Sequence, residues 1–204
     1  MDRSALYDIL DRHVPENAVH YCTDLHYQYA FLFKLAANRR TKFGDYRYDR
    51  AAKSHKITVN HSLNPYAFLI TYVHEVAHLV AFEKYGFHIR PHGKEWKITF
   101  RSLIEPVMSD LVFPANVLTA LKNYMRNPKA SSYSDPALAI ALQSYDHSSN
   151  GKLSLSALPR GKRFKLNGRV FEKGLKRRTR VLCLEVGSGR NYLVSLSAMV
   201  EECA

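Results

Sequence analysis

The sequence predicts an α+β protein: helices and a small antiparallel sheet, followed by a C-terminal part made of short strands. Three patterns support this class. Apolar residues recur at helical spacing in several segments before residue 145, and a β-branched run at 56–60 indicates a strand. From Gly151 onward, Asn167-Gly168 indicates a hairpin, and glycine-containing turns separate short runs expected to be strands, at 163–166, 169–171, 180–186 and 192–194. With 204 residues, 46% of them hydrophobic, the chain can form one ordinary domain and a small second one.

A polar segment divides the chain. Residues 127–136 consist mainly of Asn, Pro, Ser, Lys and Asp, a composition typical of a loop. We therefore expect a first domain over residues 1–126, a linker with a short helix over 127–149, and a basic, strand-rich extension over 150–204.

The first domain is expected to begin with helices at residues 4–12 and 18–35. The end of the second segment, 31–36, could instead be a strand. Gly44 and Asp45 then indicate a turn in a hairpin-like region, and 56–60 is the next expected strand.

The most informative helix is expected over residues 65–84. Asn64 suits the N-cap and Pro65 the first helical position, while Gly86 suits the C-terminal end. The segment is apolar on most sides, which predicts a helix buried in the core. Two further helices are expected, over 94–105 and 114–125.

The positive charge of the chain is concentrated near its C-terminus. The net charge is +12; residues 150–204 hold 12 Lys+Arg and 4 Asp+Glu, a balance of +8, which leaves 18 and 14, or +4, for the first 149 residues. This asymmetry favours a polyanionic partner, DNA first and an anionic membrane surface second. The alternative is a charged surface that only keeps the chain soluble.

The basic residues of the extension interleave with Phe164 and Phe171. On alternate strand positions they would form one cationic face for phosphate contacts. An ordinary exposed face, which Lys and Arg protect from edge pairing, is the alternative. The candidate nucleic-acid-binding residues are Arg160, Lys162, Arg163, Lys165, Arg169, Lys173, Lys176, Arg177, Arg178 and Arg180.

The three cysteines are too few and too scattered for a disulfide framework or a cysteine zinc ribbon, and they suggest a reducing compartment. The N-terminus lacks the apolar core of a signal peptide. No apolar run reaches the roughly 18–20 residues of a membrane span. We therefore expect a cytoplasmic protein with no membrane partner, associated with the nucleoid if it binds DNA.

An HExxH motif, residues 74–78, lies within the expected buried helix. Helical positions four apart point in nearly the same direction, so His74 and His78 can bind one Zn²⁺ ion. Glu75 lies beside them, where it can take a proton from a water at the metal. A catalytic zinc site needs three protein ligands and a fourth position for water.

The sequence leaves the third ligand open. A compact metzincin pattern is excluded, because Lys84 stands where that pattern needs its third histidine. His92 is favoured because it precedes a helix and Gly93 permits close backbone approach. The candidates after the motif are His88, His92, Glu95 and Glu105, with Glu105 better placed than Glu95.

An HExxH motif, a loop, and then His-Gly followed by an aromatic residue together resemble the SprT-like family, which includes the Spartan proteases. The stretch 39–44, followed by a strand ending at Asn60, is similar to the β-region of that family, and the resemblance covers roughly residues 20–110. It implies a zincin-like zinc metalloendopeptidase that acts on DNA-associated or DNA-crosslinked proteins in DNA repair. The residues that carry it are His74, His78 and His92 as ligands of one Zn²⁺, Glu75 as catalytic residue, and Gly93 and Trp96.

The chain departs from many members of that family in one respect. They carry a four-cysteine zinc ribbon after the catalytic part, whereas this chain has only Cys183 and Cys203 there. A second zinc is therefore not implied. Two other functions stay open: a DNA-binding module whose zinc is structural or vestigial, and a zinc hydrolase with a non-DNA substrate.

Overall fold

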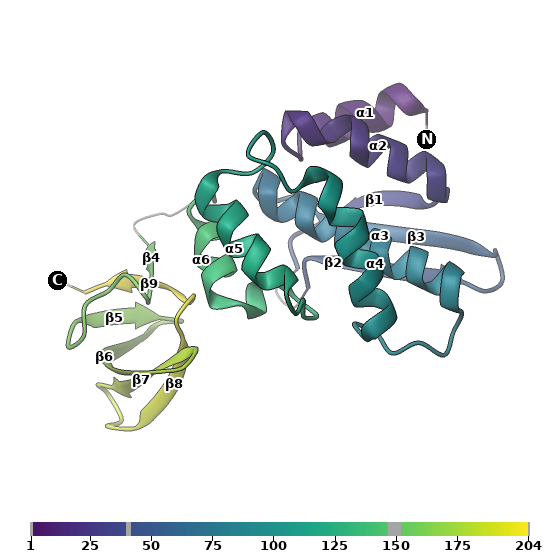
Figure 1. The fold of residues 1–204 in the computed structure, drawn as a ribbon. Helices are drawn as coiled ribbons and strands as arrows, with labels where there is room; N and C mark the ends of the chain where they lie inside the picture. Colours follow the sequence, from purple (N-terminus) through teal and green to yellow (C-terminus); the bar gives the residue numbers. More distant parts are fainter. Residues whose placement is uncertain (1, 40–41, 147–151, 204) are drawn as a thin grey trace. The chain divides into compact units, whose positions relative to one another are not determined.

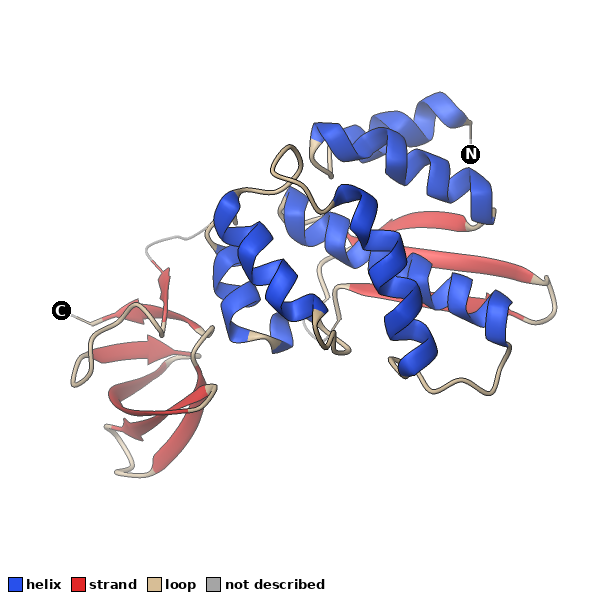
Figure 2. Ribbon diagram, viewed as in Figure 1, coloured by secondary structure: helices blue, strands red, loops and turns tan. Residues whose placement is uncertain are grey.

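A computed structural model describes residues 2–39, 42–146 and 152–203, so Arg40 and Thr41 of the family-like stretch lie outside the described residues. The chain divides into two compact units, Met1–Ser134 and Asp135–Ala204. The described residues form six α-helices and two sheets, which confirms the predicted α+β class (Figures 1 and 2). No described helix combines the length and the apolar character needed to cross a membrane.

The N-terminal unit contains a three-stranded sheet in the order β1-β3-β2. Its strands are β1 (Leu32–Ala36), β2 (Gly44–Asp49) and β3 (Ser54–Asn60). β2 and β3 pair antiparallel as a hairpin, but β1 is parallel to β3. The prediction of an antiparallel sheet is therefore confirmed for β2 and β3 and was wrong for β1, because β1 pairs with the free edge of β3 rather than with β2.

The first two helices end earlier than the sequence pattern predicted. α1 spans Arg3–Asp11 and α2 spans Val19–Tyr29. Ala30 then adopts a left-handed conformation with φ of 45°, which ends α2 and leads into β1. The strand alternative for residues 31–36 is thus the correct one.

α3 (Pro65–Tyr85) is the central helix of the unit, and the Asn64 side chain accepts a hydrogen bond from the backbone N–H of Ala67, as expected of an N-cap. Gly86 ends the helix with φ of 76°. α3 packs against β2 and β3 and also against α4, which spans Lys94–Ile104. Its predicted burial is confirmed, since most of its residues are inaccessible to solvent. α5 (Ala115–Met125) and short 3₁₀ turns at Glu16–Ala18, Glu105–Val107 and Ser132–Ser134 complete the unit.

The C-terminal unit consists of α6 (Pro136–Gln143) and a six-stranded antiparallel sheet. Asn167 and Gly168, both with positive φ, form the predicted hairpin turn between β5 and β6. Phe164 and Phe171 are buried in the core of this unit. The strands, in their order across the sheet, are β4 (Lys152–Ser154), β9 (Met199–Glu202), β5 (Arg163–Leu166), β6 (Arg169–Arg177), β7 (Arg180–Glu185) and β8 (Asn191–Ser195). The sequence pattern did not predict β4 and β9.

Candidate metal centre

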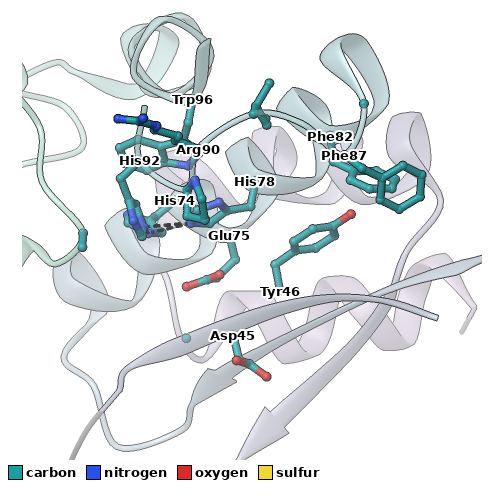
Figure 3. Close-up of a pocket in the computed structure, with 15 residues that line it drawn as sticks. Asp45, Tyr46, His74, Glu75, His78, Phe82, Phe87, Arg90, His92 and Trp96 are labelled. Atoms are coloured by element: carbon teal, nitrogen blue, oxygen red, sulfur yellow. Dashed lines mark hydrogen bonds between the residues drawn. The ribbon is translucent and has the colours of Figure 1, made fainter. Parts of the chain in front are cut away.

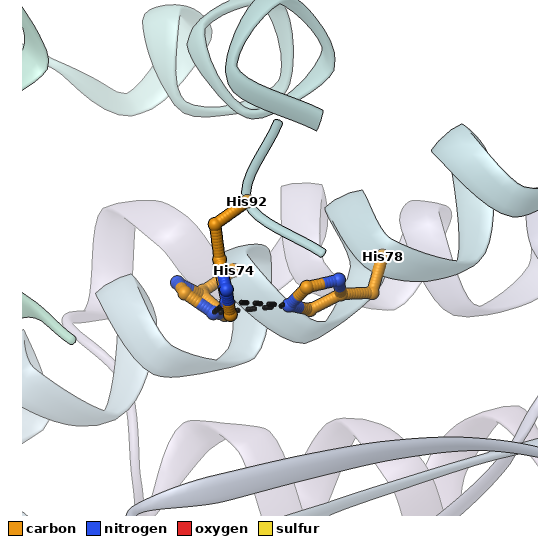
Figure 4. Close-up of side chains that lie close together, drawn as sticks. All are labelled: His74, His78 and His92. Atoms are coloured by element: carbon orange, nitrogen blue, oxygen red, sulfur yellow. Dashed lines mark hydrogen bonds between the residues drawn. The ribbon is translucent and has the colours of Figure 1, made fainter. Parts of the chain in front are cut away.

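Three histidines converge in the N-terminal unit (Figure 4). His74 and His78 lie one turn apart on α3, and His92 comes from the loop before α4. Their Nε2 atoms are 3.1 Å (His74–His92), 3.2 Å (His74–His78) and 3.0 Å (His78–His92) apart. Zn–N bonds of 2.0–2.1 Å in a tetrahedral site place ligand nitrogens about 3.3 Å apart. The triad therefore has the spacing that one zinc ion requires.

The loop before α4 brings His92 back over α3 through a tight turn. The backbone N–H of Gly93 donates to the carbonyl of Arg90 at 2.8 Å. A Cβ on Gly93 would lie only 2.8 Å from that carbonyl oxygen, so the close approach requires glycine. His92 itself adopts φ of 59°, a region that few non-glycine residues occupy.

The environment of the triad keeps its imidazoles neutral. Burial, reinforced by the neighbouring histidines, lowers the pKa of His74 well below its usual value. Burial and His92 likewise lower the pKa of His78 to about 3, and burial also lowers the pKa of His92. A metal ligand must be the neutral imidazole, which offers a free lone pair. Both the donor set and its protonation state therefore fit zinc.

Glu75 lies between the histidines and strand β2, with 7% of its surface exposed (Figure 3). Burial, together with the charge of Asp45, raises the pKa of Glu75 to about 8, while the backbone N–H of Tyr46 donates to the carboxylate and opposes this shift. A proton acceptor with a pKa near neutrality is suited to general acid–base catalysis.

Gly44, at the start of β2, makes room for this carboxylate, a role that the sequence pattern did not reveal. A Cβ on residue 44 would lie 2.5 Å from Oε1 and 2.7 Å from Cγ of Glu75, and 2.7 Å from Cγ2 of Thr71. The signal was a glycine at a strand start, which suggested only a turn.

Replacement of Gly44 by alanine should therefore move Glu75 and lower any hydrolytic activity by about a hundredfold, since a shift of about 1 Å in a catalytic group has this effect. Zinc content should stay unchanged, because the triad is not displaced. Gly187→Ala is the matched control: a Cβ there meets no atom within 4 Å. Equal activity of both variants would contradict the assigned role of Gly44.

The buried carboxyl group also predicts a pH dependence of stability when a chelator is present. Since the pKa of Glu75 rises from 4.5 to about 8 on folding, its stabilising protonation is complete below pH 4.5 and is lost as the pH rises through 8. The histidines of the triad have lowered pKa values in the folded chain, so they add stability as the unfolded chain loses its imidazole protons near pH 6.5, and they do so equally in Glu75→Gln. The free energy of unfolding of the wild type, taken relative to that of Glu75→Gln, should thus fall by about 2 kcal/mol between pH 6.5 and 8. Urea titrations of both proteins across this range measure the difference, and a constant difference would contradict the prediction.

The triad and Glu75 open into a cavity of about 420 Å³ (Figure 3). Tyr46, Phe82 and Phe87 form an aromatic wall on one side. The Tyr46 ring lies parallel to the His78 ring, with centroids 6.3 Å apart, and its hydroxyl shares a hydrogen bond of 3.0 Å with His55 Nδ1. The cavity therefore offers an apolar surface next to the metal-binding atoms.

The other residues considered for this site lie apart from the triad. His88 and Glu105 are exposed, and Glu95 is half-buried. Within the described parts of the chain, the histidine triad is the single group of side chains placed to hold a metal ion. Trp96 is fully buried and its ring packs against all three imidazoles.

The candidate nucleic-acid-binding residues of the C-terminal unit do not share one exposed face. Lys173 is buried, and its ammonium group donates to the carbonyls of Leu155, at 2.6 Å, and Leu158. Its inclusion among phosphate-binding residues was therefore wrong. The reason is that Lys173 lies on the same side of β6 as the buried Phe171. The exposed candidates are Arg160, Lys162, Arg163, Lys165, Arg169, Lys176, Arg177, Arg178 and Arg180.

Comparison with known proteins agrees with the geometry of the N-terminal unit. The model of the SprT-like family matches residues 13–113. Protein SprT of Vibrio parahaemolyticus serotype O3:K6 (strain RIMD 2210633) is 51% identical over 41 residues, 20% of this chain and 24% of that protein. Protein SprT of Pseudomonas fluorescens (strain SBW25) is 49% identical over 35 residues, 17% and 21% of the two chains.

These alignments span about a fifth to a quarter of the length of the curated relatives. No solved structure matches the chain. The family match includes the HExxH motif and His92, the residues that the structure brings together. The chain belongs to the SprT-like family.

Proposed function

We propose that the protein is a zinc metalloendopeptidase with a zincin-like catalytic domain in residues 1–126. The observation that carries this proposal is the convergence of three neutral imidazoles, with Nε2 atoms 3.0–3.2 Å apart, beside the buried carboxyl group of Glu75. His74, His78 and His92 would hold the ion. A triad with an adjacent acid–base group in an open cavity suits a catalytic zinc site better than a closed structural one.

The chemistry follows from the placement of the residues. When bound, zinc acts as a Lewis acid that lowers the pKa of a water and polarises a carbonyl oxygen. Glu75 accepts a proton from the attacking water while the water oxygen bonds to the carbonyl carbon of the peptide. It then gives that proton to the leaving amine as the C–N bond breaks. The backbone N–H of Tyr46 orients the carboxylate for both transfers.

We further propose that the substrates are proteins associated with DNA, including crosslinked proteins, and that the enzyme acts in the cytoplasm, at the nucleoid. Support comes from the charge of the chain, since residues 150–204 carry a balance of +8. A basic unit joined to a catalytic one would raise the local concentration of substrates that lie on DNA.

Metal removal tests the proposed catalysis. The purified protein should contain one zinc ion and cleave an unstructured protein such as casein. Chelation should abolish cleavage, and stoichiometric zinc should restore it. Metal analysis measures the zinc content, and gel assays with and without duplex DNA measure the cleavage. Zinc binding without cleavage in either condition would indicate instead a DNA-binding module with a structural metal.

A further inference from the structure

The basic residues of the C-terminal unit fall into two groups when they are sorted by their partners. Residues 150–204 contain four glutamates and twelve basic residues. Each glutamate pairs with a different cation: Lys152–Glu201, Lys162–Glu202, Arg163–Glu172 and Arg169–Glu185. The ammonium group of Lys173 is buried and donates to backbone carbonyls. Seven cations remain, and none of them forms an ion pair with a described residue.

Five of these seven cations lie at or beside the turn between β6 and β7. Both strands are labelled in Figure 1. Lys176 and Arg177 end β6, Arg178 lies in the turn, and Arg180 begins β7. Arg160 reaches the same place from the loop before β5, because it lines a cleft of about 580 Å³ together with Lys176 and Arg178. The cleft lining also includes one carboxylate, Asp135, which accepts hydrogen bonds from the backbone N–H groups at the start of α6 and forms no ion pair with these cations. The other two lie away from this turn: Lys165 is on β5, and Arg190 directly precedes β8.

Lys173 fixes the loop that carries Arg160. Besides the carbonyls of Leu155 and Leu158, the backbone carbonyl of Ser156 accepts a hydrogen bond of 3.4 Å from Lys173 Nζ. The backbone completes the attachment: Gly161 N–H donates to the Lys173 carbonyl at 2.7 Å, and Lys173 N–H donates to the Lys162 carbonyl at 2.9 Å. The buried lysine therefore serves as a structural support that holds an exposed arginine beside the turn.

The strand geometry exposes the other cations together. The register of β6 shifts between Lys173 and Lys176, at a bulge that includes Gly174, where a Cβ would lie 2.4 Å from the carbonyl oxygen of Leu182. After the bulge, residues 175–180 are all exposed instead of alternating. Arg178 adopts φ of 27°, where glycine would cost less. Strain of this kind is concentrated at functional sites.

We propose that this end of the sheet is a binding site for the phosphate backbone of nucleic acid, formed by Arg160, Lys176, Arg177, Arg178 and Arg180. The proposal rests on the DNA-associated substrates inferred above, and it replaces the predicted sheet face with a turn-centred site. Guanidinium groups bind phosphate oxygens through paired donors. Duplex DNA carries one charge per about 1.7 Å of its axis, whereas a folded protein surface mixes both signs. Five cations with no acidic partner therefore match the uniform negative charge of a nucleic acid better than the mixed charges of a protein surface.

Two double variants of the full chain test the site at equal net charge. Lys176→Gln/Arg178→Gln removes two cations of the cleft, and Lys165→Gln/Arg190→Gln removes two exposed cations that lie outside the proposed site. A fluorescent 20-base-pair duplex of random sequence is the probe, titrated at several salt concentrations. Arg178→Gly serves as a further variant, since it removes a cation while relieving the strained φ, so that weaker binding cannot be attributed to unfolding.

The cleft variant should bind the duplex about fiftyfold more weakly at 0.1 M salt, with a salt dependence reduced by about two ions, because each phosphate contact contributes about 0.9 to the slope. The control pair should leave the slope unchanged. Equal effects of the two pairs, or no binding by the wild type, would overturn the site. Competition by poly-L-glutamate as effective as by DNA would instead indicate a site for acidic protein. Casein cleavage and zinc content, measured in the same samples, show separately whether the metallopeptidase proposal holds.

Discussion

Glu75→Gln should retain one zinc ion and lose hydrolytic activity by about a hundredfold to ten-thousandfold, the usual contribution of a general acid–base group. Glutamine keeps the size of the side chain and can still accept a hydrogen bond from the backbone N–H of Tyr46. It cannot exchange a proton with water. The three imidazoles should keep their positions, because their mutual distances depend on α3 and on the loop that precedes α4.

A matched control lies on the same helix. Glu83, two turns beyond Glu75, is half-exposed and lies 3.5 Å from His55 Nε2. Glu83→Gln makes the same chemical change away from the triad and should leave kcat near that of the wild type. Zinc content is measured by metal analysis and kcat by cleavage of a quenched fluorescent peptide. Wild-type activity in Glu75→Gln would remove this residue from the mechanism and favour a structural metal.

The parts of this site that the sequence predicted are those that local geometry determines. The spacing of His74 and His78 sets their common direction on any helix, and Asn64 with Pro65 predicts where that helix begins. Local geometry also determines the hairpin at Asn167-Gly168, because these two residues readily adopt the positive φ angles of a tight turn that pairs β5 with β6.

The features that were missed depend on contacts between distant segments. Gly44 meets Glu75 only because β2 packs against α3, and a strand start gives no indication of such a contact. β1 forms a parallel pair because it joins β3 rather than β2, and the local sequence does not indicate that choice. The alternating pattern of β6 predicted that the side chain of Lys173 would be exposed. It is buried instead, because the carbonyls of Leu155 and Leu158, in an earlier loop, accept hydrogen bonds from its ammonium group.

His92→Ala should lower zinc affinity by more than about a hundredfold, since changes to groups that merely support a ligand already cost about 10–100-fold. His92 supplies the Nε2 atom that lies 3.1 Å from His74 and 3.0 Å from His78, so its loss leaves two ligands from α3. Competition with a chromophoric chelator measures the affinity, and circular dichroism checks that the fold persists.

The loop that carries His92 also supplies the control. His88 lies four residues earlier and is exposed, so His88→Ala should keep full affinity. Alanine at residue 92 must adopt φ near 59°, and His92→Gly removes that strain while still deleting the ligand. Zinc loss in both residue 92 variants therefore reports the missing imidazole rather than a distorted turn. Full zinc stoichiometry in both would assign the third ligand to another residue, with Glu95 and Glu105 the next to substitute.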